Sequence, residues 1–172
     1  HDGVKHAIEV MCSLMLPQKI GSAVGDTIIL REVTDGETVE IDDMKVTFFD
    51  ICSTKLQQFG FKAVLPSGKR VVCLGDEPYS AHEKPYAEGA DWLLCEAFCL
   101  YNDRATFRPY EKNHSTALDA GKLAGELGVK NLLLYHTEDT NLSQRKATYT
   151  AEAKSVFDGN VCVPDDLEVI DL

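Results

Sequence analysis

The chain lacks long hydrophobic runs and is poor in basic residues. No apolar stretch approaches the ~20 residues that a membrane-spanning helix needs, so no membrane partner is expected. The 17 lysines and arginines face 28 aspartates and glutamates, which leaves a net charge of −11 over 172 residues. An acidic surface repels a phosphate backbone at long range. A long nucleic acid is therefore not the expected partner.

Repeats, low-complexity tracts and linkers are also absent, and the length favours one domain over residues 1–172. The six cysteines show no paired C-x-x-C spacing. Cys73, Cys95 and Cys162 lie in apolar runs, where cysteine behaves as a small buried hydrophobe. The visible start carries no signal peptide. These features predict a reducing, cytoplasmic setting.

Hydrophobic periodicity predicts a helix at one end of the chain and a series of strands after it. Residues 2–15 carry the apolar stripe of an amphipathic helix. Asp35-Gly36 predicts a hairpin between strands at 27–33 and 37–41. Further apolar runs predict strands at 44–51, 59–65, 70–74, 92–97, 132–135, 161–163 and 167–172. A helix is predicted over 151–157, with Thr150 as its N-cap. Antiparallel strands followed by strand–helix–strand units indicate a mixed-sheet α/β or α+β layered fold.

The stretch from Asn113 to Asp139 organises the chemistry. Thr116 and Asp119 have the spacing of a capping box, so a helix is predicted to start there. The apolar run at 132–135 then predicts a buried strand. His114 precedes the helix and His136 follows the strand. Open α/β sheets place ligands and catalytic groups at the carboxyl ends of strands, which makes His136 a candidate site residue.

Three strand ends carry residues that bind metals: Cys52, Asp76 and His136. Layered folds assemble metal sites from such distant positions. Gly75 lets the backbone turn sharply, so that Asp76 can project from the sheet edge. Each residue also has an ordinary structural interpretation. Asp76 suits a turn, His136 a hydrogen-bonded core position and Cys52 an inert thiol.

Together these motifs resemble the metallo-β-lactamase superfamily, and its ribonuclease Z-like branch in particular. The resemblance covers most of the chain from Met44 onward, and its motifs are LGDEP at 74–78, WLLCEA at 92–97, NHSTALDAGKLA at 113–124 and LLLYHTED at 132–139. It implies an αβ/βα layered sandwich and metal-dependent hydrolysis, with a phosphodiester as the favoured substrate. Asp76 would bridge two divalent ions, zinc by preference, and His136 would bind the second ion. His114 would assist proton transfer to the leaving group.

Two departures from the family pattern leave the activity of this chain open. The H-x-H-x-D-H signature, which supplies most metal ligands, is not present. We expect it in a leading portion before His1, so that the domain is N-terminally incomplete. Cys52 stands where the family has another histidine ligand, and a cysteinate can bind zinc. The alternative is an inactive, metal-poor fragment or a binding module of the same fold. A thioester, lactone or lactam hydrolase of this fold also fits.

Basic residues near the predicted site could meet substrate phosphates. Lys55 and Lys112 are the candidate substrate-binding residues, with Arg104 and Arg108 close by in the sequence. Glu96, at the end of a predicted strand, could support a histidine as a neighbouring carboxylate. The acidic net charge favours a small or short substrate.

A domain without its leading portion would leave sheet edges open. The predicted strands 44–51 and 59–65 are expected to be these edges. An open edge pairs readily with another chain. We therefore expect a homodimer or a partner strand.

Overall fold

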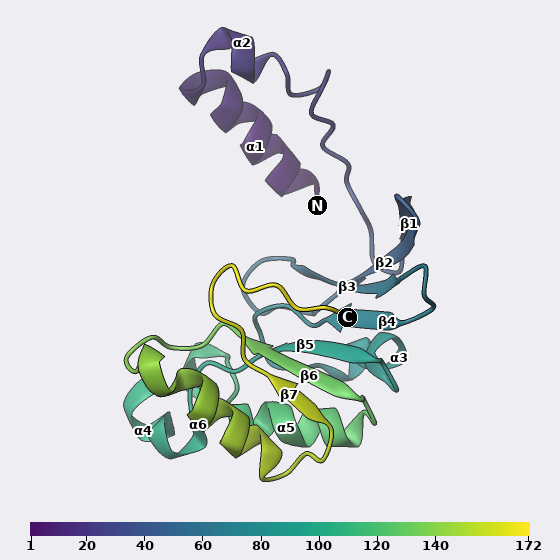
Figure 1. Cartoon of the computed structure of the whole chain (residues 1–172). Coiled ribbons are helices and arrows are strands. Elements are labelled where there is room, and N and C mark those ends of the chain that lie inside the picture. Colours follow the sequence, from purple (N-terminus) through teal and green to yellow (C-terminus); the bar gives the residue numbers. More distant parts are fainter.

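The computed structural model describes residues 1–172 and contains a seven-stranded mixed sheet with helices packed on one face (Figure 1). The strands are β1 (Thr38–Ile41), β2 (Met44–Asp50), β3 (Phe59–Val64), β4 (Arg70–Cys73), β5 (Trp92–Glu96), β6 (Asn131–Tyr135) and β7 (Asn160–Cys162). They follow one another across the sheet in sequence order. Pairing is antiparallel from β1 to β4 and parallel from β4 to β7. The predicted mixed-sheet layered fold is confirmed.

The helices differ in length and position. The α-helices are α1 (Asp2–Met15), α2 (Gln18–Gly21), α3 (Lys84–Ala87), α4 (Arg104–Phe107), α5 (Ala117–Glu126) and α6 (Leu142–Lys154). Short 3₁₀ turns are η1 (Ala81–Glu83), η2 (Tyr101–Asp103) and η3 (Tyr110–Lys112). None of the helices has the length and apolar composition that crossing a membrane requires. Helix α5 starts with the predicted capping box, in which the Thr116 side chain accepts from the Asp119 N–H.

The two faces of the sheet bury different amounts of apolar surface. On one face Leu93 and Leu132 pack with Ala120 of α5 and Ala153 of α6 in the main core of 20 buried residues. The other face carries a smaller apolar cluster, built from Val39, Val46, Ala63 and Val71. Successive side chains of a strand point to opposite faces, so neighbouring apolar residues of one strand pack into different clusters. The helical layer therefore lies over the parallel half of the sheet.

Helices α1 and α2 stand apart from the sheet at the end of an extended segment (Figure 1). The predicted amphipathic helix at 2–15 is confirmed, but neither α1 nor α2 contains a buried residue. The apolar stripe of α1 is exposed at Val4, Met11 and Met15. The amphipathic pattern thus forms a helix here without a core to cover.

The predicted hairpin around Asp35-Gly36 is wrong. Residues 27–33 form no strand, and only an isolated bridge joins Val24 to Ile28. A strand needs a partner for its backbone groups, and this segment has none beside it. The hairpin lies one strand later, where the turn at Asp42 joins β1 to β2. The Asp35 carboxylate instead accepts a hydrogen bond from the Asp50 N–H at 2.8 Å.

Two predictions near the C-terminus also need correction. Helix α6 begins at Leu142, so Thr150 lies inside it and is not its cap. Only Tyr149 and Ala153 of α6 are buried, which leaves little apolar periodicity to mark its start. Residues 167–172 are not a strand, because the sheet ends at β7. The terminal Leu172 instead lines the apolar surface beside Ile41 and Met44.

The strands expected to be open edges are both internal. The segment 44–51 corresponds to β2, which lies between β1 and β3. The segment 59–65 corresponds to β3, which lies between β2 and β4. The sheet therefore has β1 and β7 as its edges. The sequence pattern paired the strand at 37–41 with residues 27–33. In the structure this strand is β1 and pairs with β2, so β2 is not an edge.

Replacement of Gly60 by alanine is expected to destabilise the sheet. A Cβ atom at Gly60 would lie 2.6 Å from the carbonyl oxygen of Cys73 and would overlap the ring of Phe49. Relieving this overlap should cost roughly 1–3 kcal/mol of unfolding free energy, measured by urea denaturation. Gly125→Ala in α5 is the matched control, because its nearest atom is 3.8 Å away. Equal stability of the two variants would contradict the packing at Gly60.

Candidate functional site

The carboxyl ends of several strands meet at one edge of the sheet. Strands β4, β5 and β6 are parallel neighbours, so their following residues lie at the same rim. Asp76 follows β4, Glu96 ends β5 and His136 follows β6. The Tyr135 hydroxyl donates a hydrogen bond to the Gly75 carbonyl, which joins the ends of β4 and β6 directly. Strand β2 runs in the same direction as β4, so Cys52 lies at this rim too.

The loop before α5 brings His114 to the end of β5. The Phe98 N–H donates to the Ser115 carbonyl at 3.0 Å, and the Ser115 N–H donates to a Glu96 carboxylate oxygen at 2.5 Å. The capping box at Thr116 fixes the start of the helix directly afterwards. Local helix capping and long-range pairing together therefore place His114 beside Glu96.

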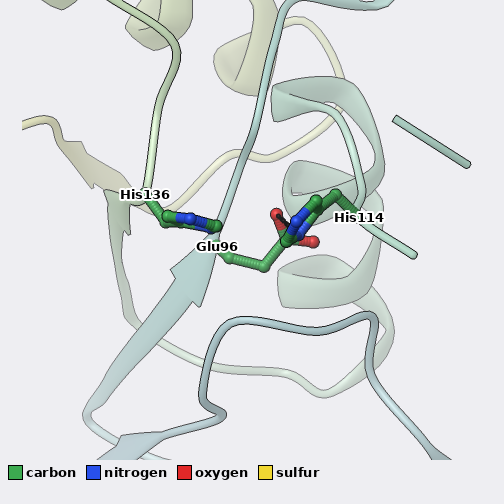
Figure 2. Close-up of side chains that lie close together, drawn as sticks. All are labelled: Glu96, His114 and His136. Carbon is green, nitrogen blue, oxygen red and sulfur yellow. Dashed lines mark ion pairs between the residues drawn. The ribbon is translucent and has the colours of Figure 1, made fainter. Parts of the chain in front are cut away.

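Glu96, His114 and His136 form a compact cluster, in which their side chains approach one another (Figure 2). One ligand atom of each residue lies within 4.8 Å of the others. His114 Nδ1 is 3.6 Å from Glu96 Oε2, and the two imidazole ring centroids are 4.8 Å apart. Glu96 and His114 are buried, whereas His136 is exposed. The cluster thus joins a buried acid–imidazole pair to an imidazole at the surface.

Burial changes the proton affinity of both buried groups. It raises the pKa of Glu96 to about 7, although hydrogen bonds from Ser115 act in the opposite direction. It also lowers the pKa of His114, and the nearby His136 and Lys55 lower it further. The charge of Asp76 raises the pKa of both His114 and Glu96. Asp76 therefore lies near enough to influence the cluster electrostatically.

The cluster fits a divalent cation. Glu96 Oε2 and His114 Nδ1 are buried without a hydrogen-bond partner, an arrangement that is costly unless a proton or a cation lies between or beside them. Carboxylate oxygen and imidazole nitrogen are both zinc ligands. The arrangement has two chemical interpretations. The three side chains could hold one ion together, or Glu96 could orient His114 beside an ion held by His136 and Asp76.

The remaining predicted site residues are not part of this three-residue cluster. Cys52 is exposed, has a left-handed backbone (φ 59°), and its Sγ lies 3.9 Å from the Asp50 carbonyl oxygen. Asp76 is half-buried at the same rim. The structure thus brings His114 and His136 into contact range, places Asp76 near enough to act on the cluster through its charge, and leaves Cys52 outside the cluster.

Both candidate lysines lie close to His114. The Lys112 ammonium is 5.0 Å from the centre of the Phe98 ring, and this ring stacks on His114 at 5.1 Å. Lys55 lowers the pKa of His114 through its charge. Arg104 and Arg108 are engaged elsewhere, over the Tyr101 ring and with Glu111. The two lysines therefore supply positive charge on the His114 side of the cluster, while Arg145 lines a pocket together with His136.

The sequence interpretation missed two residues around the site. Phe98 packs against both histidines, at 5.1 Å and 6.2 Å between ring centroids. Glu77 is buried and bonded to the segments on either side of the cluster. Glu77 adjoins the predicted ligand Asp76, and Phe98 follows the Glu-Ala motif. No sequence pattern indicated a role for either residue. Their roles arise from contacts between distant segments.

Comparisons with known proteins identify relatives by sequence and by fold. No family model matches the chain. A ribonuclease Z of Bradyrhizobium sp. (strain ORS 278) is 32% identical over 145 residues, which are 83% of this chain and 43% of the relative. A ribonuclease Z of Streptococcus gordonii is 35% identical over 105 residues, 61% of this chain and 33% of the relative. The chain spans less than half the length of these curated relatives.

Solved structures give the same fold. The metallo-β-lactamase fold protein YhfI from Bacillus subtilis superimposes with a TM-score of 0.63 at 24% identity, over 77% of this chain and 52% of that chain. The short form of human tRNase Z gives a TM-score of 0.58 at 21% identity, over 77% and 45% of the two chains. The expected metallo-β-lactamase-like fold is thereby confirmed. By its fold, its motifs and its ribonuclease Z relatives, the chain belongs to the metallo-β-lactamase superfamily, in the ribonuclease Z-like branch.

Proposed function

We propose that this chain carries the metal-binding and proton-transfer residues of a ribonuclease Z-like, metal-dependent hydrolase that cleaves phosphodiesters. One observation carries the proposal. Glu96, His114 and His136 converge at one rim of the sheet, where Glu96 Oε2 and His114 Nδ1 are buried without a hydrogen-bond partner. Sequence relatives named ribonuclease Z support the reaction class. The alternative of a metal-poor, non-catalytic module would leave these two buried atoms without a partner.

Each residue has a proposed role. His136 and Asp76 hold a divalent ion, zinc by preference, and Cys52 adds a thiolate at the same rim. Such an ion, when bound, supplies an activated water and polarises the phosphoryl group. Glu96 orients His114 through Nδ1, which leaves Nε2 free to protonate the leaving oxygen. A pKa lowered by burial makes the protonated His114 a stronger acid.

Lys55 and Lys112 are proposed to bind the substrate phosphate, because both lie beside His114. A small or short phosphodiester fits this limited positive charge. The names of the relatives, ribonuclease Z and tRNase Z, nevertheless weigh against the expectation that long nucleic acid is not a partner. That expectation used the average charge of −11, whereas binding depends on the local charge around the site.

Domain organisation, association and setting are further parts of this proposal. We treat residues 1–172 as one partial hydrolase domain and the protein as cytoplasmic, a setting with which the six free cysteines agree. A homodimer or a partner strand would pair with an open sheet edge. The edge strand β1 is available for such pairing.

Zinc titration of the purified chain tests the proposed function. We expect at least one equivalent of ZnCl₂ to bind by isothermal titration calorimetry, and bis(p-nitrophenyl) phosphate to be hydrolysed until EDTA is added. His136→Ala should weaken zinc binding more than about tenfold, since it removes a ligand. His82→Ala is the matched control, because His82 pairs with Asp35 away from the cluster. Zinc binding that is absent, or equal in both variants, would contradict the proposal.

A further inference from the structure

Glu77 connects the segments that surround the candidate site. Its side chain is only 4% exposed, although Asp76 beside it reaches the rim. One carboxylate oxygen accepts from the Ser53 hydroxyl at 2.8 Å and lies 3.7 Å from the Lys55 ammonium. The other accepts from the Asn113 side-chain amide at 2.6 Å and from the Thr54 N–H at 3.3 Å. A single buried carboxylate thus joins the loops after β2, after β4 and before α5.

The joined loops adopt uncommon backbone conformations. Cys52, directly before Ser53, has a φ of 59°, and Asn113, directly before His114, has a φ of 61°. Non-glycine residues pay a steric cost in this left-handed region. Such conformations persist only when the surrounding structure holds them. Each loop has hydrogen bonds of its own at these points, and Glu77 is the side chain that bonds to both loops.

Charge makes these contacts stronger than ordinary hydrogen bonds. A buried carboxylate that accepts from N–H and O–H donors forms charge-assisted bonds, roughly twice as strong as neutral ones. Three hydrogen-bond donors and the Lys55 ammonium surround the two oxygens of Glu77. Thr54 also accepts from Asn113, at 3.3 Å, so the two loops touch each other beside Glu77. Removing the charge would therefore loosen both loops together.

We propose that Glu77 is a positioning residue that sets the places of His114 and Lys55 by tying their loops to the end of β4. Asn113 transmits this restraint to His114, and Ser53 with Thr54 transmits it to Lys55. The identification of these loops as a substrate site rests on the proposed function. The restraint itself is a property of the folded chain and can be measured without metal or substrate.

The substitution Glu77→Gln tests the restraint with little change in volume. The glutamine amide oxygen can still accept from Asn113 and Thr54, but only as neutral hydrogen bonds, and its NH₂ group cannot pair with the Lys55 ammonium. Amide hydrogen exchange at Thr54 and His114 should then be about 10–100-fold faster than in the parent chain. Amides in the middle of α6 should not change. Zinc affinity should fall about tenfold, because Glu77 adjoins the proposed zinc ligand Asp76 and holds the loop that carries it.

A double variant provides the rescue. In Glu77→Gln/Asn113→Asp the glutamine amide donates to the new carboxylate, which restores the bond between these positions with reversed polarity. Aspartate tolerates the left-handed backbone at 113. Exchange at His114 should return to within about threefold of the parent value. Glu111→Gln removes the same charge from an exposed carboxylate of the neighbouring turn and should change neither readout.

Three outcomes would overturn the proposal. The first is unchanged exchange at Thr54 and His114 in Glu77→Gln. The second is faster exchange throughout the chain, α6 included, which would mean a general loss of stability. The third is amide exchange at His114 that is as fast in the double variant as in Glu77→Gln. Failure of the parent chain to bind zinc would overturn the proposed function alone, since the exchange results decide the role of Glu77.

Discussion

Replacing His114 by alanine is expected to lower kcat for a phosphodiester with a poor leaving group by about 10²–10⁴-fold, the range of general acid catalysis. An alkoxide leaves slowly unless it receives a proton. His114 is the buried imidazole that Glu96 can orient for this transfer, at 3.6 Å between Nδ1 and Oε2. A nitrophenolate leaves readily without a proton, so hydrolysis of its diesters should change far less. The ratio of the two rates in one variant measures the proton transfer alone.

Zinc affinity shows whether His114 acts as the general acid or as a metal ligand. If Glu96 and His114 act as a pair beside an ion held by His136, the His114→Ala variant should bind zinc as tightly as the parent chain. If the three residues hold one ion together, its zinc affinity should fall as it does in His136→Ala. Calorimetry on the two variants side by side decides between the interpretations. Parallel loss of zinc in both would refute the acid role.

Glu83→Gln is expected to stabilise the chain by about 3 kcal/mol at pH 8 while leaving its stability at pH 4 nearly unchanged. Glu83 is fully buried in η1, and burial raises its pKa from 4.5 to about 7. One pKa unit corresponds to about 1.4 kcal/mol. Because the folded chain holds the proton more tightly than the unfolded chain, the parent loses stability as the pH rises from about 4.5 through 7. Glutamine carries no titrating group, so the Glu83→Gln variant should not lose stability over this pH range.

Urea denaturation at several pH values measures this difference. Glu88→Gln is the matched control, since Glu88 is an exposed carboxylate just after α3 that pairs with Lys84 across one helical turn. Its effect should stay small at every pH, as expected for a surface ion pair. A stability difference between Glu83→Gln and the parent that does not grow with pH would show that Glu83 is not a buried acid of this kind.

Local signals were sufficient where an element forms by its own pattern. The strands predicted at 44–51, 59–65, 70–74 and 92–97 agree with β2 to β5 to within one residue at each end. Helix α5 starts at the predicted capping box. The histidines at 114 and 136 adjoin the predicted helix and strand. Apolar runs and caps act over a few residues, so the sequence alone reveals them.

Local signals failed where a neighbour decides the structure. The apolar residues of 27–33 suit a strand, yet no strand lies beside them. Helix α6 buries only Tyr149 and Ala153, so its first two turns had no periodicity to reveal them. In both cases the outcome depends on which surface is available for pairing or packing, and a short sequence window does not contain that information.

The sequence by itself determined which residue types end the strands: Asp76, Glu96 and His136, with His114 before the helix. Only the tertiary structure decided that Glu96 and His114 share a buried contact and that Glu77 joins loops 24 and 36 residues away. Strand order brings these positions together, and the order of a sheet is a property of the whole chain. Burial then changes the pKa of the acid and the imidazole, because removal from water disfavours their charged forms.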